Sequence, residues 1–372
     1  MPRNIEKMQL PLFFCILVPN YFFIKFSFLL VDNKATIKVI AKKLGVSIST
    51  VSRALHDHPS IGLRTKMRVK EMAKELNYEP NLAAIQFKLG KSFTLGAIVP
   101  ELTENFFSRA ISGIEDVALQ NNYNVLFGQS HDDLSKEKEI LSAFKNNRID
   151  GLLVSLSKAT KTIDHFLELK KYNIPVVFFD RVPKADDIYS VSCDLYSGSI
   201  KIVDYLWERG HRHIALLKGP QALTATNERM RGFMEGLSRK RMKTDPSLFS
   251  TSNLTRESSW NAMKDILSQK NRPTAVIAFN DYVALDAMQY VKRFTKLKIN
   301  KDICFVSYSN LPMRVYLETP PLVSIEQFPY EQGKKATEMV MDLINKKEIT
   351  QKQIILEGKL IELEECQSAS AI

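Results

Sequence analysis

The chain has 372 residues, of which 45% are hydrophobic, and a formal net charge of +11. This length suits two or three domains, and the hydrophobic content is that of a globular protein with a core, which excludes a disordered or fibrous chain. The four cysteines are far apart and lack CxxC spacing, which argues against a zinc ribbon and a disulfide framework and favours a reducing compartment.

The positive charge is concentrated in one short segment. Residues 32–90 contain eleven Lys or Arg against five Asp or Glu, whereas residues 1–31 carry a balance of +2 and the remaining 282 residues only +3. A basic module on a nearly neutral body indicates a head that binds a polyanion. On charge alone, a merely solvated charged surface remains an equal alternative.

Residues 10–31 form an almost unbroken apolar segment. It is long enough to span a bilayer, which needs about 20 apolar residues. The residues that interrupt it are Pro11, Pro19, Asn20 and Lys25. A lysine near the middle of a span is costly. The segment also lacks the small-residue cleavage site of a signal peptide, and Phe14 precedes Cys15 where a lipidation signal needs a small residue.

Two interpretations of residues 1–33 therefore remain open. They are a genuine apolar leader, or upstream DNA translated from a mis-called start, with the true start near Leu30 or Val31. The second is favoured, because Phe, Leu, Ile, Asn and Lys are the residues that AT-rich DNA encodes. We expect no membrane anchor and a cytoplasmic protein.

Residues 34–79 are expected to form a small domain of short helices. Ile37, Ile40, Ala41 and Leu44 lie at i, i+3, i+4 and i+7, which is one apolar helix face. Gly45 then suits a C-cap. Ser47 suits the N-cap of a second helix over residues 48–55, and a third helix is predicted over residues 64–78. Residues 80–92 read as a linker with helical potential of its own, beginning at Pro80 and closing at Gly90.

From Phe93 onward, short apolar segments of strand length alternate with amphipathic helical segments. The nine predicted strands cover residues 95–100, 123–129, 151–156, 175–180, 190–194, 213–219, 274–280, 303–309 and 322–327. Helices are predicted between them, for example over residues 105–122 and 197–210. Continuous apolar strands that alternate with helices indicate parallel sheets covered on both faces, and nine strands suggest two α/β lobes over residues 93–372.

The segment over residues 36–55 reads TIKVIAKKLGVSISTVSRAL and contains the long pattern GVSxxTVSRxL. It resembles the DNA-reading head of the lactose-repressor/galactose-repressor (LacI/GalR) family of transcription factors. The segments NYEPNLAA, LGAIVPELTENFF and ERGHRHIALLKGP follow in the family's order, so the resemblance covers about residues 35–365. It implies an N-terminal all-α helix-turn-helix head plus an α/β two-lobed periplasmic-binding-protein-like effector domain, with parallel sheets and three interlobe crossovers.

By this resemblance, the second helix enters the major groove of DNA. Ile48 and Ser49 at its start, and Arg53 one turn later, would face base edges, where an arginine can bond guanine through two hydrogen bonds. The residues expected to contact phosphate are Ser47, Thr50 and Ser52.

The resemblance also makes residues 80–92 a hinge helix that lies in the minor groove. Asn81 would cap it and Ala84 would lie against the groove floor. Phe87 stands where the family often places a leucine wedge, and a phenylalanine can also unstack a base step. Packing of Phe87 against the body is the alternative.

The effector would bind between the lobes at the strand carboxyl ends. The positions carried over from the family are Phe106, Phe107, Asp180, Arg229, Leu254, Asn280, Asp281 and Ser309. Phe106 and Phe107 are expected on the loop after the first strand. Many members have an Asp pair where this chain has Ser309 and Asn310, so no known effector can be copied directly. For Asp180, Asn280 and Ser309, a strand-end residue that caps a neighbouring helix is an equal alternative.

The expected partners are near-palindromic double-stranded operator DNA, a small-molecule effector of carbohydrate type, and a second copy in a homodimer. No cofactor is expected, and the close histidine pairs lack further ligands at metal-site spacing. An enzyme is disfavoured, because Ile85 stands where the GKS at residues 90–92 would need a P-loop glycine. An exported or membrane-tethered solute-binding protein of the same two-lobed fold is the alternative function.

Overall fold

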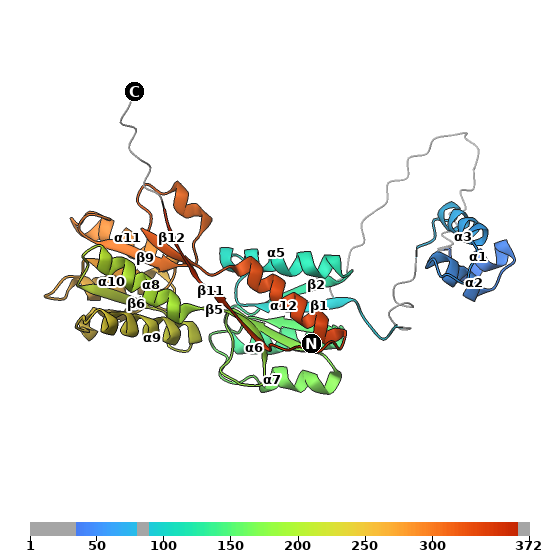
Figure 1. Cartoon of the computed structure of the whole chain (residues 1–372), viewed down its shortest axis with the longest axis horizontal. Coiled ribbons are helices and arrows are strands. Elements are labelled where there is room, and N and C mark those ends of the chain that lie inside the picture. Colours follow the sequence, from blue (N-terminus) through green and yellow to red (C-terminus); the bar gives the residue numbers. More distant parts are fainter. Residues whose placement is uncertain (1–34, 80–88, 364–372) are drawn as a thin grey trace, which may run out of the picture. The chain divides into compact units, whose positions relative to one another are not determined.

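The computed structural model describes residues 35–79 and 89–363 (Figure 1). The predictions for residues 1–33 and for the hinge residues Asn81, Ala84 and Phe87 lie outside these ranges. The chain divides into two compact units, a head and a body, with the division falling between residues 80 and 88. No helix within the two described ranges is both long and apolar enough to cross a membrane.

The head consists of three helices, α1 (Ile37–Leu44), α2 (Ile48–Leu55) and α3 (Leu63–Glu75). Its core lies where the helices meet and contains Ile40, Val51 and Val69, each fully buried. Gly45 ends α1 with a φ of 67° and its N–H donates to the carbonyl of Ala41. Glycine adopts this left-handed conformation without a steric cost, so the turn into α2 forms as predicted.

The first lobe of the body is built on a six-stranded, fully parallel sheet of order β11-β5-β4-β3-β1-β2. Its strands are β1 (Thr94–Val99), β2 (Asn124–Gln129), β3 (Gly151–Val154), β4 (Val176–Phe179), β5 (Tyr189–Asp194) and β11 (Gln353–Glu357). Its helices are α5 (Asn105–Gln120), α6 (Leu134–Asn146), α7 (Asp164–Leu167), the 3-10 helix η1 (Glu168–Tyr172) and α12 (Pro329–Ile344). Two apolar clusters fill the space between sheet and helices.

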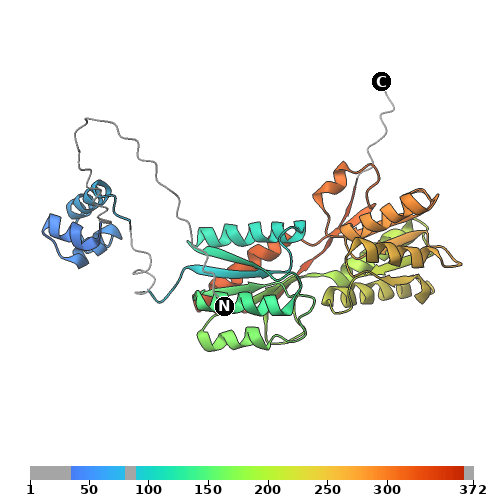
Figure 2. The same cartoon turned by 180° about the vertical axis from the view of Figure 1, so that it is seen from behind.

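The second lobe repeats this plan with the sheet order β12-β10-β9-β8-β6-β7, in which β12 alone runs antiparallel to its neighbour. Its strands are β6 (Ile214–Lys218), β7 (Phe249–Thr251), β8 (Ala275–Ala278), β9 (Cys304–Tyr308), β10 (Val323–Glu326) and β12 (Lys359–Glu362). Its helices are α8 (Leu195–Glu208), α9 (Thr224–Arg239), α10 (Arg256–Leu267), α11 (Asp281–Phe294), and the 3-10 helices η2 (Pro246–Leu248) and η3 (Pro312–Tyr316). Figure 2 shows helices covering both faces of each sheet.

The chain crosses between the lobes three times. It leaves the first lobe after β5, returns between β10 and α12, and leaves again between β11 and β12. The prediction of a two-lobed α/β body with parallel sheets and three interlobe crossovers is confirmed.

Helices α5 and α12 lie side by side on one face of the first sheet (Figures 1 and 2). Their contact depends on glycine. A Cβ at Gly113 would collide with the carbonyl of Tyr330, and one at Gly333 would collide with the carbonyl of Ala110. Each helix therefore supplies a glycine against the backbone of the other, which lets the two backbones touch.

Candidate functional site

Helix α2 has a buried face and a polar face. Val51 and Ala54 are fully buried in the head core, whereas Ile48, Ser49 and Arg53 are exposed. Arg53 forms no ion pair with any residue of the described head. The three side chains assigned to base edges thus lie on the face of α2 that the head leaves free.

Ser47 caps α2, because its Oγ accepts the N–H of Thr50 at 3.0 Å. The same oxygen lies 2.7 Å from Ser49 Oγ and 2.8 Å from Thr50 Oγ1. These contacts hold a cluster of hydroxyls at the exposed amino end of α2. Hydroxyls and N–H groups at a helix amino end are groups that bind phosphate.

Phe106 and Phe107 do not lie on the loop after β1, and this prediction is wrong. Both are in the first turn of α5, where their rings pack edge to face at 5.3 Å within the core of the first lobe. Phe107 is fully buried and Phe106 nearly so. The physical reason is that α5 already begins at Asn105, so the aromatic pair falls on the apolar face of an amphipathic helix with Ala110 and Ile114.

Arg229 is the most unusual side chain in the body. It projects from α9 between the rings of Phe279 and Tyr308, which lie 4.2 Å and 4.3 Å from its guanidinium carbon. It is 6% exposed, and its Nη2 donates to Gln327 Oε1 at 3.2 Å. Its Nε and Nη1 have no hydrogen-bond partner among the described residues. A small pocket adjoins it, lined by residues of β6, α9 and β8 together with Tyr308.

A buried cation with two unused donors is costly unless a partner satisfies them. Burial lowers the pKa of the Arg229 guanidinium, although Tyr308 and Asp180 favour its charged form. An arginine nevertheless stays protonated in proteins. The geometry therefore suits a ligand that supplies acceptor oxygens.

Asp180 follows β4, at the carboxyl end of the first sheet, with a φ of 58°. Burial raises the pKa of its carboxyl to about 6, against the opposing effects of Arg181 and of Arg229 from the other lobe. Beside it, Arg181 donates to Asp132 at 2.6 Å. Burial likewise raises the pKa of Glu104, with Asp180 and Asp132 adding to the shift. The Asp180 carboxyl of the first lobe thus lies near enough to Arg229 of the second lobe for their charges to interact.

Asp281 and Asn280 both serve the second lobe itself. The Asp281 carboxylate is fully buried and accepts from Leu311 N at 2.6 Å, from Ser324 Oγ at 2.9 Å and from Ser307 Oγ. Asn280 Oδ1 caps α11 by accepting the N–H of Val283 at 2.9 Å. The Asp281 carboxylate is therefore occupied by donors of its own lobe and is not available to a ligand.

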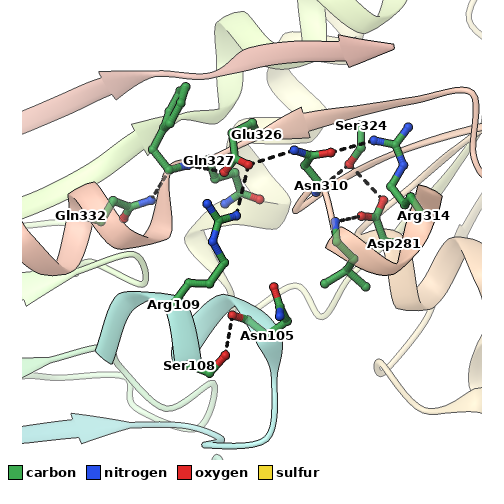
Figure 3. Close-up of polar contacts among 12 residues, drawn as sticks. Asn105, Ser108, Arg109, Asp281, Asn310, Arg314, Ser324, Glu326, Gln327 and Gln332 are labelled. Carbon is green, nitrogen blue, oxygen red and sulfur yellow. Dashed lines mark hydrogen bonds and ion pairs between the residues drawn. The ribbon is translucent and has the colours of Figure 1, made fainter. Parts of the chain in front are cut away.

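The Ser309–Asn310 pair follows β9 with φ values of 97° and 50°. Figure 3 shows Asn310 held between Glu326 and Arg314. Asn310 Nδ2 donates to Glu326 Oε2 at 2.9 Å, and Arg314 Nη1 donates to Asn310 Oδ1 at 2.9 Å. Arg109 reaches the same Glu326 oxygen from α5 at 3.3 Å, so this carboxylate joins the two lobes (Figure 3). Asn310 is thus occupied inside the protein.

Leu254, expected as a wall of the effector site, has a φ of 67° in the loop between β7 and α10. It packs against the core of the second lobe, and its N–H donates to Ser252 Oγ at 3.0 Å.

Sequence reasoning missed four residues of this region, namely Phe279, Tyr308, Glu326 and Gln327. A general signal for them existed. Each lies at the carboxyl end of a strand or within one residue of it, and strand carboxyl ends carry ligands in open α/β sheets.

Comparison with known proteins covers both units. The family described as "Periplasmic binding proteins and sugar binding domain of LacI family" matches residues 92–363, and "Bacterial regulatory proteins, lacI family" matches residues 36–81. The chain is 31% identical to the HTH-type transcriptional repressor PurR of Edwardsiella ictaluri over 329 residues, which are 88% of this chain and 96% of that protein. It is 29% identical to the HTH-type transcriptional repressor CytR of Escherichia coli (strain K12) over 330 residues, 89% of this chain and 96% of that one.

A crystal structure of the lac repressor dimer bound to operator and an anti-inducer has the same fold. Its TM-score is 0.76 at 23% identity, covering 88% of this chain and 98% of that chain. Family matches on both units and relatives aligned along nearly their full length lead to one conclusion. This chain belongs to the LacI family and is a DNA-binding transcriptional regulator controlled by a small-molecule effector.

Proposed function

We propose that the protein is a cytoplasmic repressor, without enzymatic activity, that binds a near-palindromic operator as a homodimer. The observation that carries this proposal is the free face of α2, where Ile48, Ser49 and Arg53 are exposed beside the hydroxyl cluster at Ser47. Arg53 would read a guanine, Ile48 a thymine methyl, and Ser47, Thr50 and Ser52 would bind phosphate. The repressors PurR and CytR and the operator-bound lac repressor dimer support the mode of action.

The hinge completes the proposed contact with DNA. Asn81 would begin a hinge helix within residues 80–92, Ala84 would lie on the groove floor and Phe87 would wedge into a base step at the operator centre. Two hinges from two subunits fit the two-fold symmetry of a near-palindrome.

The effector is proposed to be a polar metabolite of sugar or nucleoside size, bound where Arg229 and Asp180 meet. Two unused donors on Arg229, the carboxyl of Asp180 and the aromatic rings of Phe279 and Tyr308 suit a ligand with several oxygen acceptors and hydroxyls. The sugar-binding character of the matching family supports this class. Ser309 remains a proposed contact at the end of β9, and Leu254 and Asn280 contribute through the core and the cap they form.

Effector binding would act by shifting a population of lobe arrangements. The Arg109–Glu326 ion pair joins α5 of the first lobe to the last residue of β10 in the second lobe, so a change of lobe angle would alter it. A ligand that prefers one arrangement biases the DNA-binding form by its difference in affinity. Either release from DNA or recruitment to it is compatible with this scheme.

The test is a two-step binding experiment on the full chain. Selection from random duplex DNA should enrich two half-sites related by a two-fold axis, and enrichment of no sequence over scrambled DNA would refute the proposal. A thermal-shift screen of sugars and nucleosides should then find a stabilising ligand. The ligand should lose its effect on Arg229→Gln but keep it on Arg231→Gln, a control two residues along the same helix whose side chain is 65% exposed.

A further inference from the structure

A second pocket lies at the opposite end of the first lobe from the effector site. It has a volume of about 440 Å³ and is lined by residues that directly precede β1, β3 and β4, together with residues at the carboxyl ends of α6 and α12 (labelled in Figure 1). The pocket therefore lies at the amino ends of the strands, whereas Asp180 and Arg229 lie at carboxyl ends. Gly90 and Lys91 also line it and belong to the last residues of the linker over residues 80–92.

The lining is strongly basic. Four cations face this pocket, Lys91, Lys145, Arg148 and Lys346, against the single carboxylate of Asp150. None of the four forms an ion pair with another residue of the described body. Lys91 donates to the neutral amide of Asn345 at 3.2 Å. Asp150 is already engaged, since its two oxygens accept the N–H groups of Ser92 at 2.9 Å and Phe93 at 2.8 Å.

The carboxyl ends of two helices neutralise only part of this positive charge. α6 and α12 both end at the pocket, and the carboxyl end of a helix behaves as roughly half a negative charge. Two such ends together offset about one of the cations. The lining has an excess of three positive charges over its carboxylate, so a clear positive excess remains after the helix ends are counted.

The rest of the lining suits a small organic molecule. The apolar wall of the pocket consists of Ile149, Ile174 and Pro175. Tyr172 is 55% exposed, and Lys145 Nζ lies 5.1 Å from the centroid of its ring. An exposed aromatic ring can stack on a sugar or a base. The volume falls within the roughly 300–1,000 Å³ of small-molecule sites.

We propose that this pocket binds a phosphorylated metabolite of sugar-phosphate or mononucleotide size, with the phosphate held by Lys145, Arg148, Lys91 and Lys346. Its organic part lies on Tyr172 and the apolar wall. Lys91 lies three residues before the start of β1 at Thr94, so this end of the first lobe is where the site forms. The binding site itself goes beyond the proposed control of operator affinity and does not depend on it.

The test is calorimetric titration of the full chain without DNA, using glucose 6-phosphate, inorganic phosphate and glucose as probes. Glucose 6-phosphate should bind more tightly than inorganic phosphate. The double variant Lys145→Gln/Arg148→Gln should weaken glucose 6-phosphate binding by about tenfold or more, as expected for the loss of one or more charge-assisted hydrogen bonds. The matched control Lys270→Gln/Arg272→Gln, which removes two exposed cations from the second lobe, should leave that affinity unchanged.

Four results would overturn the proposal. The first is that neither phosphate probe binds at millimolar concentration, and the second is that both double variants lose the same affinity for glucose 6-phosphate. The third is that Arg229→Gln loses glucose 6-phosphate binding while Lys145→Gln/Arg148→Gln keeps it. The fourth is that glucose binds as tightly as glucose 6-phosphate. A weaker affinity of Lys145→Gln/Arg148→Gln for scrambled DNA, without any binding of glucose 6-phosphate, would assign the cations to DNA phosphates instead. Because DNA is absent from the titration, failure of the operator experiment leaves its outcome intact.

Discussion

At the scale of single residues, the body concentrates its unmet electrostatics on Arg229 and Asp180. Burial disfavours the charged form of each side chain, and their opposite charges interact from different lobes. Burying such groups without hydrogen-bond partners raises the free energy of the ligand-free protein. A ligand that supplies the partners removes this cost, and the energy gained contributes to binding.

Asp180 gives the free protein a defined pH dependence. Its pKa rises from an ordinary 3.8 to about 6, so the folded state binds more protons than the unfolded state between these values. Stability contributed by this group is full below about pH 4 and is lost as the pH rises through about 6. In urea unfolding at pH 4 to 7, Asp180→Asn should therefore lose less stability than the wild type as the pH rises. Parallel profiles would contradict a raised pKa.

Arg53 should determine one base pair in each half-site. Replacing it with alanine should reduce discrimination there by about 1–3 kcal/mol, because two hydrogen bonds to guanine are lost. Competition binding against operators varied at every position measures this. Arg68→Ala, which removes an exposed arginine from α3, serves as the control and should leave the ranking of sequences unchanged. An unaltered preference in Arg53→Ala would remove Arg53 from the readout.

At the scale of elements, the contact between α5 and α12 leaves no room for a side chain at Gly113 or Gly333. Gly113→Ala should lower the free energy of unfolding by about 1–3 kcal/mol, because the added methyl meets the Tyr330 carbonyl and must push the helices apart. Urea unfolding would measure it, with Ser112→Ala as an exposed control on the same helix. Alanine is the better helix former, so a stabilised Gly113→Ala would mean that the two helices separate freely.

Most elements of the fold were predictable from periodicity and end signals. The two head helices around Gly45 and the nine apolar strands follow from side-chain spacing alone. The strands β7, β11 and β12 were not predicted. β7 has only three residues, and β11 and β12 are half-exposed edge strands of mixed polar sequence whose partners come from distant parts of the chain. Pairing of that kind is set by the rest of the sheet.

The candidate site was predictable as a set of strand ends, but its members could not be sorted from sequence. The family resemblance gave Asp180 and Arg229 as effector contacts, and that role stays a prediction. Asp281 differs from Asp180 only in what surrounds it, since Ser307 and Ser324 arrive from β9 and β10 to occupy its carboxylate. Phe106 and Phe107 were misplaced because the family resemblance put them on a loop, although the helix predicted over residues 105–122 already included them.

At the scale of the whole molecule, operator binding and effector binding should differ in how strongly they depend on salt. The basic segment at residues 32–90 should make operator affinity fall steeply with salt, because each neutralised phosphate releases counterions. For a dimer with six or more phosphate contacts, the loss is about a thousandfold between roughly 50 and 200 mM salt. Fluorescence anisotropy would measure this loss. The affinity for an uncharged effector should stay nearly constant over the same range, and a salt-independent operator affinity would exclude phosphate as the main contact.

The three crossovers also determine when the body can fold during synthesis. β11 completes the first sheet and β12 completes the second, and both are made within the last described stretch, from Gln353 to Glu362. Neither lobe is a continuous piece of chain, so neither reaches its full set of strands until residues 353–362 have left the ribosome. A premature stop a few residues before Gln353 therefore removes an edge strand from both lobes at once, and the ten residues from Gln353 to Glu362 complete both lobes.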